Sequence, residues 1–115
     1  MKPQIYHNPR CSKSRQTLQL LEAKNVEVEI IEYLQTPPDA ATLDRILTQL
    51  NIEPRQLMRT RESEYLELGL DNPSLDRVSL INAMVKTPKL IERPIVVTDK
   101  GIAIGRPPEN ILKVL

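Results

Sequence analysis

The first third of the chain alternates apolar and polar positions in a strand, loop, helix, strand order. Gln4 to His7 is a short β-prone stretch that ends at a polar loop containing a proline. Residues 12–24 carry apolar side chains at helical spacing. Val26 to Tyr33 alternates and then doubles its apolar content at Ile30 and Ile31, which predicts a strand covered increasingly on both sides. Together these elements predict a βαβ unit with parallel strands and a right-handed crossover.

The middle of the chain has helical periodicity. Thr36 has the side chain of a helix N-cap, and Pro37 follows it in the first turn. This pattern predicts a helix that carries apolar residues at helical spacing through Leu50. Residues 53–70 predict one or two shorter helical pieces. Ser74 to Val85 predicts another amphipathic helix, with Val78 on its apolar face.

The last third predicts a hairpin and a short helix. Ile95 to Thr98 and Ile102 to Ile104 are apolar runs separated by a tight turn. Prolines 107 and 108 then begin a terminal helix. The order βαβ, helical block, ββα predicts an α/β chain with a four-stranded mixed sheet in the thioredoxin-like layout. We expect a single domain over residues 1–115 with a helical insertion at about 36–90.

Composition excludes several classes of protein. The 115 residues include 16 Lys plus Arg and 15 Asp plus Glu, and this net charge of +1 argues against a nucleic-acid-binding protein. Phe and Trp are absent, so very few aromatic side chains are available to stack on nucleic-acid bases. One cysteine and one histidine cannot form an internal disulfide or a usual zinc site. We therefore expect no metal and a reducing compartment.

The chain also shows no segment that would take it to a membrane. The first ten residues lack the apolar run of a signal peptide, and no later segment reaches the length of a membrane span. No exposed apolar stripe stands out in the sequence. We expect a cytoplasmic protein that is a monomer.

The single cysteine, Cys11, is a candidate nucleophile. It lies in the loop after the first strand and directly before a helix, whose first N–H groups favour a thiolate. Arg10, Lys13 and Arg15 add positive charge, and His7 is expected to add a hydrogen bond or a further charge. A lone cysteine is more often an inert buried residue. A polar loop at a helix N-terminus nevertheless favours a reactive thiol.

The same loop suits a tetrahedral oxyanion. N–H groups at a helix start, with the hydroxyls of Ser12 and Ser14, can hold such an anion. Because a thiolate and an oxyanion repel each other, cations must neutralise both, and arginine is the best suited. Two arginines at strand ends look least like ordinary surface charges: Arg93, directly before Pro94, and Arg106, after the hairpin. Sequence alone favours a trans peptide bond at that proline.

Four segments of the chain read YHNPRCSKSRQTL, YLQTPP, RQLMRTRESEYLELGL and IERPIVVTDKGIAIGRPPENIL. They resemble the ArsC-type arsenate reductases, and most closely the short YfgD-like branch. The resemblance runs in order from about Ile5 to Leu115. It implies a thioredoxin-like fold with a helical insertion.

The resemblance implies a role for each matching residue. Cys11 matches the nucleophilic cysteine, and His7 and Ser14 match neighbours that hold its thiolate. Pro94 matches the cis-proline beside that cysteine. The arginines that clamp the oxyanion match Arg59, Arg93 and Arg106, with Arg61 as an alternative to Arg59.

The implied activity is arsenate reduction in arsenic detoxification. The Cys11 thiolate would attack arsenate, and the arginines would stabilise the oxygens. Ser14 stands where a dithiol oxidoreductase carries its second cysteine, so the electrons must come from an external thiol, glutathione or glutaredoxin. No bound cofactor is expected.

Two other functions remain open. Spx-like transcription regulators share the fold and bind RNA polymerase without catalysing reduction. A glutaredoxin-like protein would also use Cys11 and Ser14, taking glutathione off mixed disulfides. The arginine set, which neither alternative needs, favours the reductase.

Overall fold

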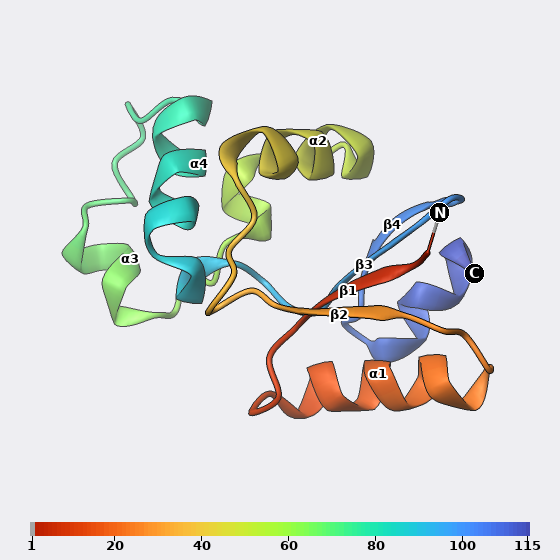
Figure 1. Ribbon diagram of the computed structural model, residues 1–115. Coiled ribbons are helices and arrows are strands. Elements are labelled where there is room, and N and C mark those ends of the chain that lie inside the picture. The colour runs from red at the N-terminus through yellow and green to blue at the C-terminus, as the bar shows by residue number, and fades with distance from the viewer. Residues whose placement is uncertain (1) are drawn as a thin grey trace. The chain divides into compact units, whose positions relative to one another are not determined.

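The computed structural model describes residues 2–115, which divide into two compact units (Figure 1). The first unit combines the chain up to Thr36 with Arg93–Leu115, and the second is Pro37–Glu92. The first unit is therefore built from both ends of the chain and contains the sheet, while the second is helical.

The sheet of the first unit has four strands in the order β2-β1-β3-β4. β1 pairs in parallel with β2 and antiparallel with β3, which in turn pairs antiparallel with β4. The strands are Gln4–His7 (β1), Glu29–Glu32 (β2), Ile95–Thr98 (β3) and Gly101–Ile104 (β4). This confirms the predicted four-stranded mixed sheet of a thioredoxin-like fold.

Two helical elements cover one face of this sheet (Figure 1). They are α1, Ser12–Ala23, and the terminal 3-10 helix η3, Pro108–Val114. Ile5 of β1 lies opposite Val96 of β3, which lies opposite Ala103 of β4, so three adjacent strands contribute one apolar row. The buried core on this face consists of Ile5, Leu21, Val96, Ala103, Ile111 and Val114.

The second strand differs from its prediction. The sequence predicted a strand over Val26 to Tyr33 covered on both sides, but β2 has four residues, of which three are exposed. Ile30 is 49% exposed. β2 has only β1 as a neighbour, and the glutamates at its two ends are typical of an edge strand that is protected from further pairing.

The second unit is a cluster of short helices. Its elements are α2 (Ala40–Leu50), η1 (Pro54–Leu57), α3 (Ser63–Glu67), α4 (Arg77–Lys86) and η2 (Pro88–Leu90). Leucines and isoleucines from several of them are completely buried, together with Met84. An isolated antiparallel bridge between Met58 and Ile91 ties η1 to the end of the unit.

Two helix starts in this unit differ from the predictions. The N-cap of α2 is Asp39 rather than Thr36, because the Asp39 carboxylate accepts a hydrogen bond from the Thr42 N–H at 2.8 Å. α4 begins after Asp76, its N-cap. Val78, which was predicted on the apolar face, lies in the first turn of α4 and is 63% exposed, whereas Leu80, Ile81 and Met84 are buried.

Candidate active site

Three segments from distant parts of the chain meet at one end of the sheet. Tyr6, near the end of β1, pairs with Ile95 at the start of β3, and Ile95 pairs with Ile104 at the end of β4. The residues that follow β1, precede β3 and follow β4 are therefore neighbours. These segments carry Cys11, Arg93 and Arg106.

A tight turn places Cys11 at the start of α1. The Cys11 N–H donates to the Asn8 carbonyl at 3.0 Å, and the Asn8 side-chain oxygen accepts from the Arg10 N–H at 3.0 Å. Cys11 is the N-cap of α1, and its carbonyl accepts from the Arg15 N–H. Its side chain is buried, with 9% of the residue exposed. The turn thus holds the sulfur beside the free N–H groups of the first helical turn.

His7 and Ser14 form a buried hydrogen-bonded pair behind the cysteine. The Ser14 Oγ lies 2.6 Å from His7 Nδ1 and accepts from the Asn8 N–H at 3.0 Å. The tautomer of His7 decides which of the two atoms donates in this pair. Burial lowers the pKa of His7, as does Arg15, against the opposing effect of Glu32. The hydrogen bond expected from His7 therefore goes to Ser14, and the lowered pKa favours the neutral imidazole.

The pKa of the Cys11 thiol is lowered from its ordinary value. Burial raises this pKa, but the N–H groups of Ser14 and Lys13 and the guanidinium of Arg93 favour the thiolate more strongly. The largest side-chain contribution thus comes from the segment before β3 rather than from the basic neighbours in the loop.

Arg106 links the two distant segments to the sulfur. Its Nη2 donates to the Cys11 Sγ at 3.5 Å, and its Nε donates to the Arg93 carbonyl at 2.8 Å. The Arg93–Pro94 peptide bond is cis, and so is Arg106–Pro107, which the sequence did not single out. The first unit therefore gathers His7, Cys11, Ser14, Arg93, Pro94 and Arg106.

Asn8 is a site residue that the sequence reasoning missed. It is buried, its carbonyl and side-chain oxygen shape the turn before Cys11, and its N–H donates to the Ser14 hydroxyl. The Asn-Pro pair that begins this turn is a recognisable signal in the sequence.

Arg59, the third predicted clamp residue, lies in the second unit. Its Nε lies 3.1 Å from the Glu62 carboxylate, and its Nη1 lies 3.3 Å from the Glu92 carboxylate. Both partners belong to the same unit as Arg59. Arg61, the alternative, is exposed.

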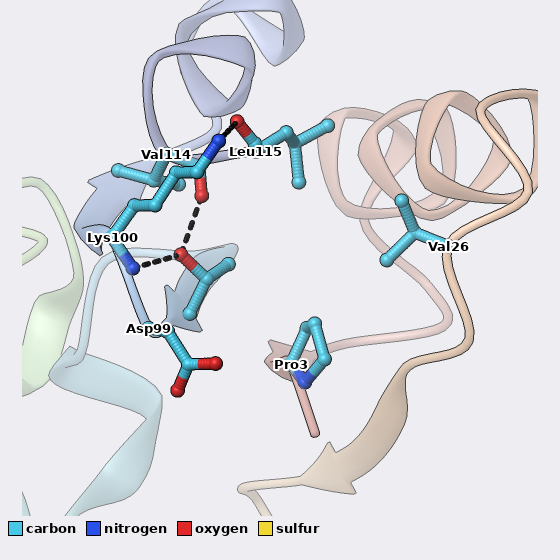
Figure 2. A pocket seen from close by; sticks show the side chains of 7 residues that line it. Pro3, Val26, Asp99, Lys100, Val114 and Leu115 are labelled. Carbon is cyan, nitrogen blue, oxygen red and sulfur yellow. Dashed lines mark hydrogen bonds between the residues drawn. The ribbon is translucent and has the colours of Figure 1, made fainter. Parts of the chain in front are cut away.

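One further hollow in the first unit lies at the other end of the strands (Figure 2). Its volume is about 200 Å³, and its lining is mostly apolar. Lys100 reaches the main-chain oxygen of Leu115 at 2.8 Å across one side of it. The residues that line the hollow are Pro3, Val26, Thr98, Asp99, Lys100, Val114 and Leu115. None of them is a nucleophilic thiol or an imidazole, so Cys11 marks the better candidate site.

Residues 2–115 lack two other kinds of feature, a metal-binding cluster and a membrane-spanning helix. No three His, Cys, Asp or Glu side chains within this range are grouped so as to hold a metal ion. Nor does this range contain a helix with the length and apolar character needed to cross a membrane.

Comparison with known proteins identifies the family. The model of the ArsC family matches residues 6–114. The chain is 54% identical over 112 residues to the uncharacterized protein YfgD of Escherichia coli, covering 96% of this chain and 94% of that one. It is 49% identical over 112 residues to an arsenate reductase of Neisseria meningitidis, covering 96% of each. The structure of an arsenate reductase from Vibrio cholerae matches with a TM-score of 0.96 and 47% identity, covering 100% of this chain and 98% of that one. The chain belongs to the ArsC family.

Proposed function

We propose that the protein reduces arsenate, with the Cys11 thiolate as the nucleophile. The observation that carries this proposal is the position of the Cys11 sulfur: it lies at the start of α1, 3.5 Å from the Nη2 atom of Arg106. The lowered pKa of the Cys11 thiol favours a nucleophilic thiolate near neutral pH. Relatives in Neisseria meningitidis and Haemophilus influenzae, 49% and 46% identical, are named arsenate reductases.

The first step forms a bond between the Cys11 sulfur and arsenic. One arsenic–oxygen bond breaks, and the oxygen leaves as water after taking up protons. Arg93 and Arg106 stabilise the negative charge on the remaining oxygens, and the N–H groups at the start of α1 add to this. The product of the step is a thiol–arsenate ester in which arsenic is still pentavalent.

The second step needs thiols from outside the chain. One external thiol attacks the Cys11 sulfur, so that arsenic leaves with two electrons as arsenite and a mixed disulfide remains. A second thiol then releases Cys11 and forms the external disulfide. The chain has one cysteine and carries Ser14 in place of a resolving thiol, so it cannot supply either. Glutathione and glutaredoxin are the donors that the resemblance implies.

The resemblance also assigns a third arginine to the oxyanion. We take this to be Arg59, with Arg61 as the alternative. Arg59 is half-buried and held by two carboxylates, whereas Arg61 is exposed. Substrate binding by Arg59 would therefore have to compete with Glu62 and Glu92.

A coupled assay tests the proposal. Arsenate reduction with glutathione, glutaredoxin and glutathione reductase is followed by the loss of NADPH. We expect Cys11→Ser to abolish this activity and Arg45→Lys, on the exposed face of α2, to retain it. Arsenate-dependent turnover by the Cys11→Ser protein would overturn the proposed mechanism.

A further inference from the structure

A buried contact between α1 and the end of the hairpin lies close to the candidate site. Thr17, one turn after Ser14, is completely buried on the core face of α1. Its Oγ1 donates to the Lys13 carbonyl at 2.8 Å and lies 3.5 Å from the Gly105 carbonyl. No step of the proposed mechanism uses this hydroxyl.

Gly105 approaches α1 too closely to carry a side chain. A Cβ at this position would lie 2.5 Å from Thr17 Oγ1, 3.1 Å from Thr17 Cγ2 and 2.8 Å from Pro94 Cγ. These separations are shorter than ordinary van der Waals contacts, so any side chain would push the segment away from the helix. The requirement for glycine comes from this close approach of the backbone.

The same segment determines where Arg106 lies. The Gly105 N–H donates to the Pro94 carbonyl at 2.9 Å, and the next N–H, that of Arg106, donates to the Ile104 carbonyl at 2.9 Å. The Arg106 side chain then bridges the Arg93 carbonyl and the Cys11 sulfur. Gly105, which contacts Thr17 of α1, thus directly precedes the arginine whose guanidinium contacts the sulfur.

We propose that Thr17 and Gly105 are positioning residues, and that their close contact sets the distance between the Arg106 guanidinium and the Cys11 sulfur. The contact lets the end of the hairpin rest directly on α1, the helix whose N-terminus holds the sulfur. An added methyl group at Gly105 moves Arg106 outward and removes its hydrogen bond to Sγ. This inference rests on the proposed function only in taking the Cys11 thiolate as the reacting group.

Alkylation of Cys11 by iodoacetamide tests the contact without arsenate. In Gly105→Ala we expect the midpoint of the pH–rate profile to move to higher pH and the rate near neutral pH to fall by about threefold to tenfold. The double variant Thr17→Ala/Gly105→Ala should recover part of this loss, because Thr17 supplies two of the three closest atoms. An unchanged profile in Gly105→Ala, or no recovery in the double variant, overturns the proposal.

Gly69→Ala is the matched control. Gly69 has a φ of +68° and lies in the second unit, with no heavy atom within 4 Å of an added Cβ. This substitution strains the backbone without a steric contact, so we expect the wild-type alkylation profile. A shift as large as that of Gly105→Ala would make general destabilisation the cause and overturn the proposal.

A second pair of variants keeps the test decisive where thermal melting shows that Gly105→Ala is unfolded. Thr17→Val keeps the shape of the side chain at the contact, whereas Thr17→Ile adds a methylene group there. We expect the alkylation rate to fall by about threefold in Thr17→Ile and to stay near wild type in Thr17→Val. Equal rates in the two variants overturn the proposal. Because alkylation does not depend on arsenate, these alkylation rates test the contact even if the protein shows no arsenate reductase activity.

Discussion

Two arginines of the first unit, Arg93 and Arg106, make different contacts from Arg59 and Arg77 of the second unit. In the first unit, Arg106 bonds a main-chain carbonyl and the Cys11 sulfur, and Arg93 favours the thiolate. In the second unit, Arg59 is paired with two carboxylates, and Arg77 is paired with Asp44 at 2.8 Å. The same type of side chain thus favours the Cys11 thiolate in the first unit and forms ion pairs at Arg59 and Arg77 in the second.

This difference bears on which arginines can bind an anion. A guanidinium bound to carboxylates has its charge largely neutralised, and an oxyanion must displace a carboxylate before it can bind. A hydrogen bond to a neutral carbonyl, such as that of Arg106 to the Arg93 carbonyl, does not itself neutralise a guanidinium. We therefore expect changes at Arg93 and Arg106 to affect activity most, and changes at the carboxylates of the second unit to affect it least.

The largest expected effect comes from Arg106→Lys and Arg93→Lys. Lysine keeps one charge but loses the planar fork, so each change should raise the barrier by about 2 to 4 kcal/mol, a fall in kcat/KM of about 30- to 800-fold. Steady-state kinetics with arsenate measure this. Arg77→Lys, which alters an exposed ion pair, is the control and should change kcat/KM little. Similar losses in all three variants would show that the arginines of the two units do not differ as proposed.

A smaller effect is expected from Ser14→Ala. The change removes the hydroxyl that bonds His7 and the Asn8 N–H, but it leaves the Ser14 N–H that favours the thiolate. Losing the two hydrogen bonds of the Ser14 hydroxyl should lower kcat/KM by about threefold to tenfold. It should also move the alkylation profile of Cys11 to higher pH, because a thiolate held less firmly forms only at a higher pH.

Ser12→Ala is the control for that prediction. Ser12 begins the same helix and is exposed, with no role in the pair formed by His7 and Ser14. Alkylation and turnover should stay near wild type in this variant. An effect as large as that of Ser14→Ala would mean that the hydroxyls act through the helix start in general and not through His7.

Local patterns predicted the sheet and the loop that carries the thiol. The alternation in β1 and the hairpin, together with a polar segment before a helix, were enough to place Cys11 at a helix N-terminus. Arg93 and Arg106 could also be singled out, because they stand at strand ends next to a proline or a glycine.

Contacts that depend on tertiary packing could not be predicted in the same way. The hydrogen bond of His7 to Ser14, the requirement for glycine at position 105 and the exposure of β2 follow from which segments become neighbours. Glu92, whose carboxylate pairs with Arg59, lies far from it in the sequence, so no local pattern predicts this pair. Periodicity identifies elements, but it does not identify which polar groups will meet.

The smallest expected effect is that of Glu92→Gln, which removes one of the two carboxylates paired with Arg59 in the second unit. Removing one carboxylate from a partly exposed ion pair should change the free energy of unfolding by about 1 kcal/mol or less. The resemblance assigns Arg59 to the oxyanion, and a weaker competitor should then lower the KM for arsenate by about twofold to threefold while kcat stays the same. Steady-state kinetics and thermal melting measure both effects. Asp44→Asn, which alters the exposed pair with Arg77, should leave KM unchanged. A KM that is insensitive to Glu92→Gln and to Arg59→Lys, but rises in Arg61→Lys, would transfer the third position of the clamp to Arg61.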